Sequence, residues 1–192
     1  MIIYVETIKI TERRYMSHIF FTRHGQTFWN VENKICGISD IALTEQGHLQ
    51  AIELGKKILN EKYEIDEIIC SPLIRARDTA MHISEITGIA VKVDSRLTEQ
   101  NFGKYEGTAR NGEEFRRAKT QLANSFSGGE SALRLAQRIY NLLDELKESE
   151  KTYLLVAHNG ISRVVYSYFH DISNEDYANY GIENCEIIRF DF

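Results

Sequence analysis

Short apolar runs alternate along the chain with longer segments in which apolar residues recur at helical spacing. The runs have the length, and the β-branched and aromatic content, of buried strands. We therefore expect strands at residues 18–22, 66–71, 89–93, 152–157 and 185–192.

Helices are predicted between these strands, where the apolar positions fall on one helical face. The first is expected over residues 43–62. The second is expected to begin at Ser71 and Pro72, because a proline in the first helical turn has no N–H whose hydrogen bond would be lost. A third follows the turn at residues 127–131, and a fourth spans residues 159–169.

Strand–helix alternation with nearly continuous apolar strands is typical of a mostly parallel sheet covered on both faces. The sequence thus predicts an α/β fold with three α/β/α layers. Residues 16–192 contain no repeat or proline-rich linker and are expected to form one domain. Within it, the polar residues 108–127 are expected to form a small helical cap over the ligand site. Residues 1–15 are interpreted as an N-terminal extension, for which a non-native start upstream of Met16 is one explanation.

The composition is that of an ordinary globular domain, with 43% hydrophobic and 27% charged residues in a chain of 192. The net charge of −5 argues against nucleic acid or an anionic membrane as the main partner. No apolar run approaches the roughly 18 residues of a membrane span. The cysteines at positions 36, 70 and 185 show neither a zinc nor a disulfide pattern, so reduced thiols in the cytoplasm are the simplest explanation.

Side chains suited to phosphate chemistry follow three of the predicted strands. Arg23 and His24 end the first strand, and Arg75 lies one turn into the helix after the second. His158 ends the strand at residues 152–157. Because the carboxyl ends of parallel strands meet at one edge of the sheet, where ligands bind, we expect two imidazoles and two guanidiniums to converge there.

This combination meets the needs of phosphoryl transfer. Two guanidiniums can hold phosphate oxygens, one neutral imidazole can attack phosphorus, and the other can stabilise charge on the transferring group. The leaving alkoxide also needs a proton donor, and Glu99 is the best candidate because it follows a strand among polar and glycine residues. Taken singly, each residue has an ordinary structural explanation, such as a helix-surface cation for Arg75 or a loop acid for Glu99.

Several motifs, taken together and in order, resemble the histidine phosphatase superfamily, also called the phosphoglycerate mutase-like family. The resemblance extends from residue 18 to about residue 190. The matching stretches are TRHGQTFWN at 22–30, GISDIALTEQG at 37–47, SPLIRARDTA at 71–80, LTEQNFGKYEG at 97–107, GGES at 128–131 and VAHNG at 156–160.

The resemblance implies a role for each matching residue. His24 would be the nucleophile that carries a transient phosphoryl group. Glu99 would protonate the leaving group and later activate water. Arg23, Arg75 and His158 would bind the phosphoryl group.

Four further residues are expected in the substrate site. Asn30 matches a family asparagine that contacts phosphate. Gln26 and Thr27 follow the signature and are expected to line the pocket. Asn159, directly after the second histidine, is expected to alter the donors to phosphate. No metal or other cofactor is implied, because cationic side chains would do the work of a metal.

The short cap favours a phosphatase over a mutase. Family mutases carry a long insertion after the segment matched by residues 97–107, and that insertion excludes water, whereas here only residues 108–127 separate Gly107 from Gly128. The sequence therefore predicts metal-independent hydrolysis of small phosphorylated metabolites through a phosphohistidine. Phosphoglycerate mutase activity and non-catalytic binding of a phosphorylated ligand are the alternatives.

Residues of the cap segment bear on substrate choice. They either recognise a second phosphate or carboxylate of the substrate, or form a solvated helical face that pairs with acids of the same segment. Sugar phosphates, phosphoglycerates, nucleotide-like phosphates and α-ribazole phosphate all stay open as substrates. The cations concerned are Arg110, Arg116, Arg117 and Lys119.

Overall fold

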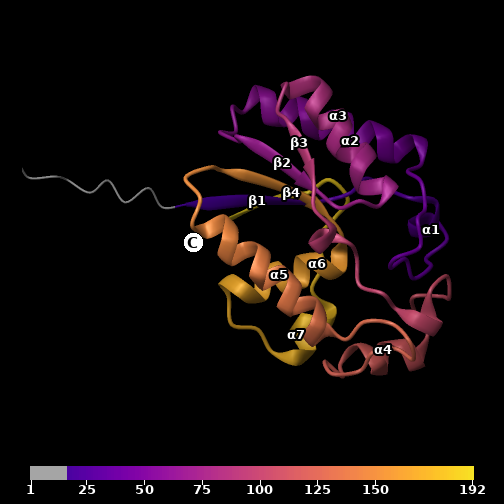
Figure 1. Cartoon of the computed structure of the whole chain (residues 1–192). Coiled ribbons are helices and arrows are strands. Elements are labelled where there is room, and N and C mark those ends of the chain that lie inside the picture. The colour runs from indigo at the N-terminus through magenta and orange to yellow at the C-terminus, as the bar shows by residue number, and fades with distance from the viewer. Residues whose placement is uncertain (1–16) are drawn as a thin grey trace, which may run out of the picture.

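A central sheet lies between two layers of helices in the computed structural model, which describes residues 17–192 (Figure 1). The expected extension at residues 1–15, and Met16, lie outside the described residues. The strand order is β3-β2-β4-β1-β5, and each neighbouring pair is parallel except β1 and β5. The predicted α/β fold with a mostly parallel sheet is confirmed. The strands are β1 (His18–Arg23), β2 (Glu67–Cys70), β3 (Val91–Val93), β4 (Tyr153–Ala157) and β5 (Ile187–Asp191).

Two long helices cover each face of the sheet. α2 (Glu45–Asn60) and α3 (Ile74–Thr87) lie above the strands in Figure 1. α5 (Ala132–Lys147) and α6 (Asn159–Phe169) lie below them. α6 has the bounds that the apolar pattern predicts, and α2 and α5 differ from prediction only at their ends.

Each helical layer buries its apolar stripe against the sheet. Leu54 and Ile58 of α2 pack in one cluster with Ile68 of β2. Leu142 of α5 packs in a second cluster with Leu155 of β4. The helical period of apolar residues in the sequence results from this one-sided burial.

The segments that follow the carboxyl ends of the strands form the right-hand side of the molecule in Figure 1, where α1 and α4 are labelled. Within the segment expected to be a cap, α4 is a helix of seven residues. α7 (Asn174–Asn179) packs beside α6. The other short elements are α1 (Phe28–Val31), η1 (Ser95–Leu97), η2 (Gly103–Tyr105) and α4 (Glu113–Lys119).

The start of α3 differs from the prediction. The helix begins at Ile74 rather than at Ser71 and Pro72. The hydroxyl of Ser71 is instead hydrogen-bonded to His158, and the free N–H of Ile74 donates to the Asp40 carboxylate at 2.7 Å. The cap of this helix therefore comes from a residue that is distant in sequence, which local start signals do not reveal.

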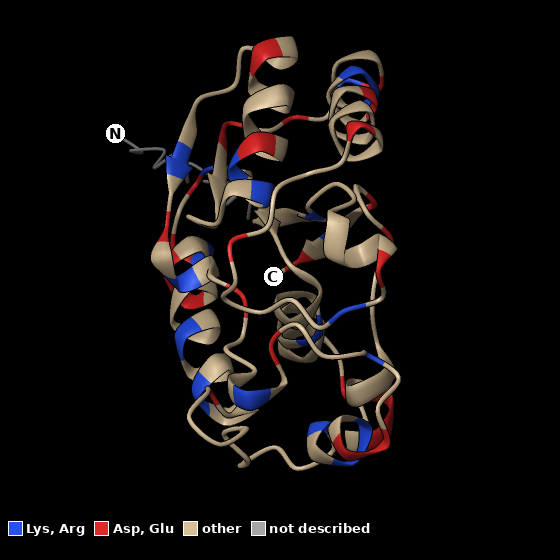
Figure 2. Ribbon diagram, turned by 90° about the vertical axis from the view of Figure 1, so that its right-hand side faces the viewer, with Lys and Arg blue, Asp and Glu red and all other residues tan. Residues whose placement is uncertain are grey.

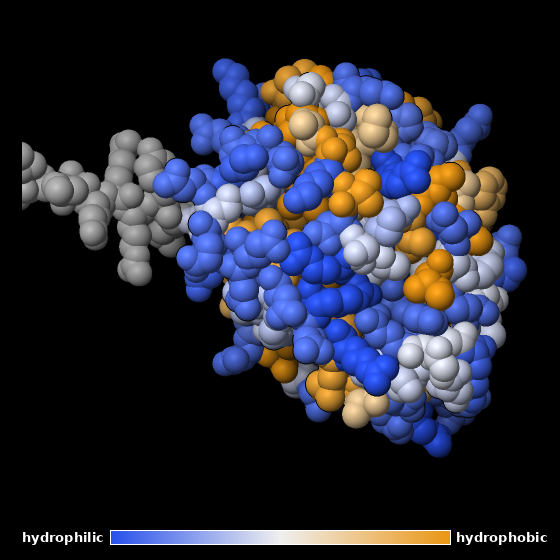
Figure 3. Space-filling model, viewed as in Figure 1, coloured by the Kyte–Doolittle hydropathy of each residue, from blue (hydrophilic) through white to orange (hydrophobic). Residues whose placement is uncertain are grey.

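The described surface is mostly polar. The face drawn in Figure 3 is largely hydrophilic, with separate apolar patches. Among residues 17–192, we find no helix with the combination of length and apolar character that crossing a membrane requires.

Candidate active site

Two histidines from distant parts of the sequence lie side by side at the carboxyl edge of the sheet. The parallel register pairs Arg23 of β1 with Ala157 of β4, so the next residue of each strand is a histidine. The N–H of His24 donates to the carbonyl oxygen of Ala157 at 3.0 Å. The ring centroids of His24 and His158 are 5.2 Å apart, and both rings are buried. Strand pairing therefore brings the two imidazoles together.

The imidazole of His24 is held in one orientation. Its Nδ1 lies 2.7 Å from the carbonyl oxygen of Gly25. A carbonyl only accepts, so Nδ1 carries the proton of the neutral ring and Nε2 keeps its lone pair. Burial lowers the pKa of His24 well below its usual range, and the charges of Arg75 and Arg23 lower it further. The ring is therefore neutral near pH 7, as a nucleophile must be.

Two guanidiniums stand next to these rings. Arg75, fully buried in α3, donates from Nη1 to the carbonyl of Ser39 at 2.8 Å and from Nη2 to the carbonyl of Gly37 at 2.7 Å. Arg23 donates from Nη1 to the carbonyl of Ile182 at 2.9 Å. Burial, followed by the charge of Arg110, lowers the pKa of Arg23 to about 10. Backbone carbonyls thus fix both cations without neutralising them.

A single carboxylate organises the loop that holds Arg75. Glu106 accepts hydrogen bonds from the N–H groups of Gly37, Ile38 and Ser39 at 3.0, 3.1 and 3.4 Å. It also accepts from the Ser39 hydroxyl at 2.7 Å and from the N–H of Phe102 at 3.1 Å. Two of the same residues, Gly37 and Ser39, present the carbonyls that bind Arg75. Sequence reasoning missed this residue, although it lies inside a matching motif.

His158 is oriented by Ser71. Nε2 of His158 lies 2.7 Å from the Ser71 hydroxyl, and that hydroxyl also accepts from the N–H of Leu73 at 3.3 Å. Burial and then the charge of Arg75 lower the pKa of His158 well below its usual range. In the neutral ring, a serine proton donated to Nε2 leaves the ring proton on Nδ1.

Three buried nitrogens of this group lack a hydrogen-bond partner in the described part of the chain. They are Nε of Arg23, Nε of Arg75 and Nδ1 of His158. A buried donor without a partner is unfavourable, so its presence points to an acceptor that is missing from the protein itself. All three belong to side chains near the ring of His24, and each nitrogen can donate a hydrogen bond to an anion.

Glu99 lies beside this group. Its Oε2 accepts from the N–H of Gly160 at 2.8 Å, and its Oε1 accepts from the N–H of Gln100 at 2.8 Å. A Cβ at position 160 would lie 2.3 Å from Oε1, so only glycine allows this approach. The carboxylate is therefore fixed at the start of α6, directly after His158. The glycine after His24 has a different function, because a Cβ at Gly25 would meet the backbone of Gly47 at 2.3 Å.

The remaining predicted site residues divide into two pairs. Asn30 and Asn159 line the pocket with Arg23, His24 and Glu99.

Gln26 and Thr27 are absent from the residues that line this pocket, as are the more deeply buried Arg75 and His158. The hydroxyl of Thr27 accepts from the N–H of Asn30 at 3.2 Å and caps α1. The amide oxygen of Gln26 accepts from the hydroxyl of Thr44, the cap of α2. Both residues shape the loop rather than the pocket.

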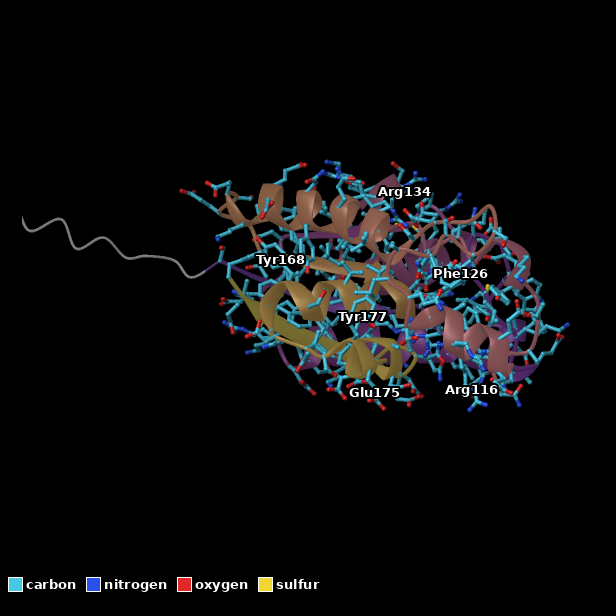
Figure 4. All side chains as sticks on the ribbon, turned by 90° about the horizontal axis from the view of Figure 1, so that it is seen from below. Arg116, Phe126, Arg134, Tyr168, Glu175 and Tyr177 are labelled. Carbon is cyan, nitrogen blue, oxygen red and sulfur yellow. The ribbon has the colours of Figure 1, made fainter. Side chains whose placement is uncertain are left out.

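The cations of residues 108–127 also divide. Arg110 and Lys119 line the pocket, together with Arg163 of α6, which sequence reasoning missed. Arg116 and Arg117 do not line it. Arg117 pairs with Glu113 at 3.2 Å, and Arg116 points away from the body of the molecule at the edge of Figure 4. Figure 2 views the strand ends and shows basic segments on several of the ribbons there.

The described residues hold no group of three or more histidine, cysteine and carboxylate side chains that could bind a metal ion. The polar groups that line the pocket are mainly cationic side chains and hydrogen-bond donors, which suit an anion.

Residues 19–192 match the family model described as the histidine phosphatase superfamily, branch 1. The chain belongs to this superfamily. The family and the enzyme class predicted from the sequence motifs, a histidine phosphatase, are therefore confirmed.

Similar proteins include both mutases and phosphatases by name. A probable phosphoglycerate mutase GpmB of Erwinia tasmaniensis is 32% identical over 186 residues, covering 92% of this chain and 85% of that protein. A 2,3-bisphosphoglycerate-dependent phosphoglycerate mutase 2 of Gloeobacter violaceus is 30% identical over 190 residues, covering 92% of this chain and 86% of that protein.

Solved structures of similar fold include phosphatases. A mycobacterial glucosyl-3-phosphoglycerate phosphatase in complex with VO3 has a TM-score of 0.79 and 28% identity, covering 90% of each chain. A phosphoserine phosphatase of Entamoeba histolytica in complex with 3-phosphoglyceric acid has a TM-score of 0.78 and 28% identity, covering 91% of this chain and 90% of that one.

Proposed function

We propose that the protein hydrolyses small phosphate monoesters, without a metal ion, through a phosphohistidine at His24. The observation that carries the proposal is the set of partnerless buried nitrogens around this ring, on Arg23, Arg75 and His158. A phosphoryl group offers the acceptor oxygens that these nitrogens lack. The lone pair on Nε2 of His24 supplies the nucleophile for the same group.

In the first step, Nε2 of His24 attacks phosphorus while the ester P–O bond breaks. A new N–P bond forms, and the leaving alkoxide takes a proton from the carboxyl group of Glu99. Arg23, Arg75 and the Nδ1–H of His158 bind the three peripheral oxygens, whose charge these donors stabilise.

In the second step, water attacks phosphorus from the side that the alcohol has left. Glu99 takes a proton from the water, a P–O bond forms, and the N–P bond breaks. The products are orthophosphate and neutral His24, so the enzyme returns to its starting state with Glu99 protonated again. No other reactant is required.

The shortness of residues 108–127 supports hydrolysis over phosphoryl return to a second hydroxyl. The only helix described in this segment is α4, with seven residues. Phosphatase names among the solved structures support the same choice. The mutase names of the sequence relatives keep isomerisation as the competing activity to be measured.

Incubation with an aryl phosphate in the presence of a chelator tests the proposal. We expect steady release of orthophosphate and, after a rapid acid-free quench, a base-stable and acid-labile phosphoprotein. His24→Ala should remove the phosphoprotein and lower kcat by about 10³-fold or more. The matched control is His170→Ala, because this histidine is exposed at the end of α6.

Loss of activity on chelation, with turnover retained in His24→Ala, would reject the mechanism. Interconversion of phosphoglycerates that outpaces phosphate release would establish a mutase instead. Binding of orthophosphate with no turnover of any ester would establish a non-catalytic module.

The free thiols of Cys36, Cys70 and Cys185 support the cytoplasm as the compartment.

A further inference from the structure

Three cations lie in the pocket in addition to those assigned to the phosphoryl group. Arg110 and Lys119 enter it from residues 108–127, and Arg163 enters it from α6. Apolar side chains form part of the pocket wall beside these cations, namely Ile35, Phe102 and Phe115. These cations come from separate segments, so their proximity results from the fold and not from a basic run in the sequence.

None of the three forms an ion pair within the described chain. The acids of α4 already have other partners, since Glu113 pairs with Arg117 and Glu114 pairs with Lys104. Arg163 donates from Nε to the carbonyl of Tyr180 at 2.8 Å, and Arg110 donates from Nη2 to the carbonyl of Lys34 at 3.1 Å. These neutral acceptors orient the guanidiniums without balancing their charge.

The charges of the pocket do not balance when only a phosphoryl group is bound. Arg23 and Arg75 together match a phosphate dianion, and Glu99 is the only acidic side chain described in the lining. Even when ionised, Glu99 balances only one of the three further cations, and in the protonated state proposed for the first step it balances none, so a positive surplus remains. Like charges that line one pocket repel each other, and an anion bound between them relieves this repulsion.

The titration of these groups supports this account. Burial, and then the charges of Arg163 and Arg110, lower the pKa of Lys119 to about 7. Burial also lowers the pKa of Arg163; the carboxylate of Glu99 opposes this effect in part, and the charge of Arg110 adds to it. Both cations are thus destabilised first by burial and then by repulsion from other cations of the pocket.

We propose that Arg110, Lys119 and Arg163 bind a second anionic group of the substrate, so that the preferred substrates are phosphate monoesters that also carry a carboxylate or a second phosphate. The proposal rests on the function proposed above, because the first phosphate occupies the site at His24. Of the four cations that the sequence suggests for this role, the proposal keeps Arg110 and Lys119. It leaves out Arg116 and Arg117, which do not line the pocket.

Matched pairs of esters test the proposal. One pair is 3-phosphoglycerate and glycerol 3-phosphate, which differ by a carboxylate. The other is fructose 1,6-bisphosphate and fructose 6-phosphate, which differ by a phosphate. The readout is the ratio of kcat/KM within each pair, so effects on the chemical step at His24 cancel. A charged hydrogen-bonding group alters affinity by about tenfold or more, and we expect the anionic member of at least one pair to be favoured by that factor.

The variants Lys119→Gln and Arg110→Gln should lower this ratio by about tenfold. The control is Arg116→Gln, which removes a positive charge from α4, the helix of Lys119, at a position that does not line the pocket. It should leave the ratio within about twofold. Selectivity for the carboxylate pair alone identifies a carboxylate, and selectivity for the sugar pair alone identifies a phosphate. Equal kcat/KM within both pairs, or an equal loss of the ratio in Arg116→Gln, would overturn the proposal.

Calorimetry separates this proposal from the proposed function. The same four esters are titrated into the His24→Ala protein, in which turnover is not required. A tenfold preference for an anionic member that disappears in a His24→Ala, Lys119→Gln double variant supports the second anion site even if no ester is hydrolysed. The same affinity for both members of each pair would reject the site even if hydrolysis is found.

Discussion

The carboxylate of Glu106 binds the N–H groups of the loop whose carbonyl groups bind the guanidinium of Arg75. The loop consists of residues 37–39, and Arg75 donates to its first and last carbonyls. Arg75 keeps its Nε free in this arrangement. We therefore expect Glu106 to position Arg75 in the proposed phosphate site through the backbone of this loop.

We predict that Glu106→Gln weakens the phosphate site more than it weakens the fold. An amide cannot accept from all the donors that the carboxylate binds, so the loop and Arg75 lose their fixed geometry. The affinity for vanadate and kcat/KM for an aryl phosphate should each fall about tenfold or more. Glu114→Gln is the matched control. This carboxylate is exposed, and it contacts Lys104 and the hydroxyl of Tyr105 rather than the loop at residues 37–39. An unchanged vanadate affinity in Glu106→Gln would contradict the positioning role.

A second prediction concerns the approach of Glu99 to the start of α6. In Gly160→Ala the new Cβ would collide with the Glu99 carboxylate, which must move away from the leaving group. We expect kcat to fall about 10²-fold, the contribution of a general acid, while vanadate affinity changes little. The comparison is Gly112→Ala, where a Cβ meets only one atom, at 3.4 Å. Equal kcat values in the two variants would show that turnover does not depend on the observed position of the Glu99 carboxylate beside Gly160.

The buried histidines predict a loss of stability in acid. Both His24 and His158 have pKa values well below the usual range, so the unfolded chain binds protons near pH 6.5 that the folded chain does not. The unfolded state binds more protons below this pH, and the free energy of unfolding therefore falls as the pH falls. We expect a slope of about 1.4 kcal/mol per pH unit for each ring between about pH 6.5 and pH 5.

Denaturant unfolding at several pH values measures this slope. Replacing His24 and His158 together by glutamine should remove the two contributions, whereas His170→Gln at the exposed end of α6 should keep them. A slope in this window that is the same in both variants would mean that the two rings are protonated in the folded protein.

We predict that the amine of Lys119 makes substrate selectivity depend on pH. Its pKa is about 7, and the cations facing it are Arg110 and Arg163, while Glu175 of α7 shares an outer depression with it. Binding of the second anion requires the protonated amine, so the KM of the favoured ester should rise above pH 7 relative to the partner ester that lacks this second group. The rise approaches about tenfold per pH unit until the amine of the complex also loses its proton.

Lys119→Arg provides the test, because a guanidinium keeps its charge throughout this range. The ratio of KM values within a substrate pair should become independent of pH between 6 and 9 in this variant, yet stay selective. A ratio that varies with pH to the same extent in the wild-type protein and in Lys119→Arg would exclude Lys119 as the titrating group.

The sequence predicts the layers of the fold and the phosphate-binding edge because each depends on a local pattern. The helix at about residues 159–169 has both a strong apolar period and a polar start, and the structure confirms it as α6. The start of α3 was not predicted, because its cap is the carboxylate of Asp40, which no pattern near Ile74 encodes.

The same distinction applies to the site. His24 and His158 follow strands, so strand order suffices to predict their meeting. Arg163 has no local signature, since a cation inside a helix usually faces solvent, and its place in the pocket follows from the packing of α6. Thr27 shows the opposite case, because its position beside the signature suggested a ligand contact while its hydroxyl caps α1.

The pairing of Arg23 with Ala157 has a consequence for how this enzyme tolerates change. Insertion or deletion of one residue within β1 or β4 would invert every side chain beyond it, and one imidazole would then face the opposite layer of helices. Substitutions at the rim of the molecule can change which ester is accepted, but the spacing of these two central strands has no such freedom. Variation in length should accordingly be confined to the connecting loops, which leave the phase of both strands intact.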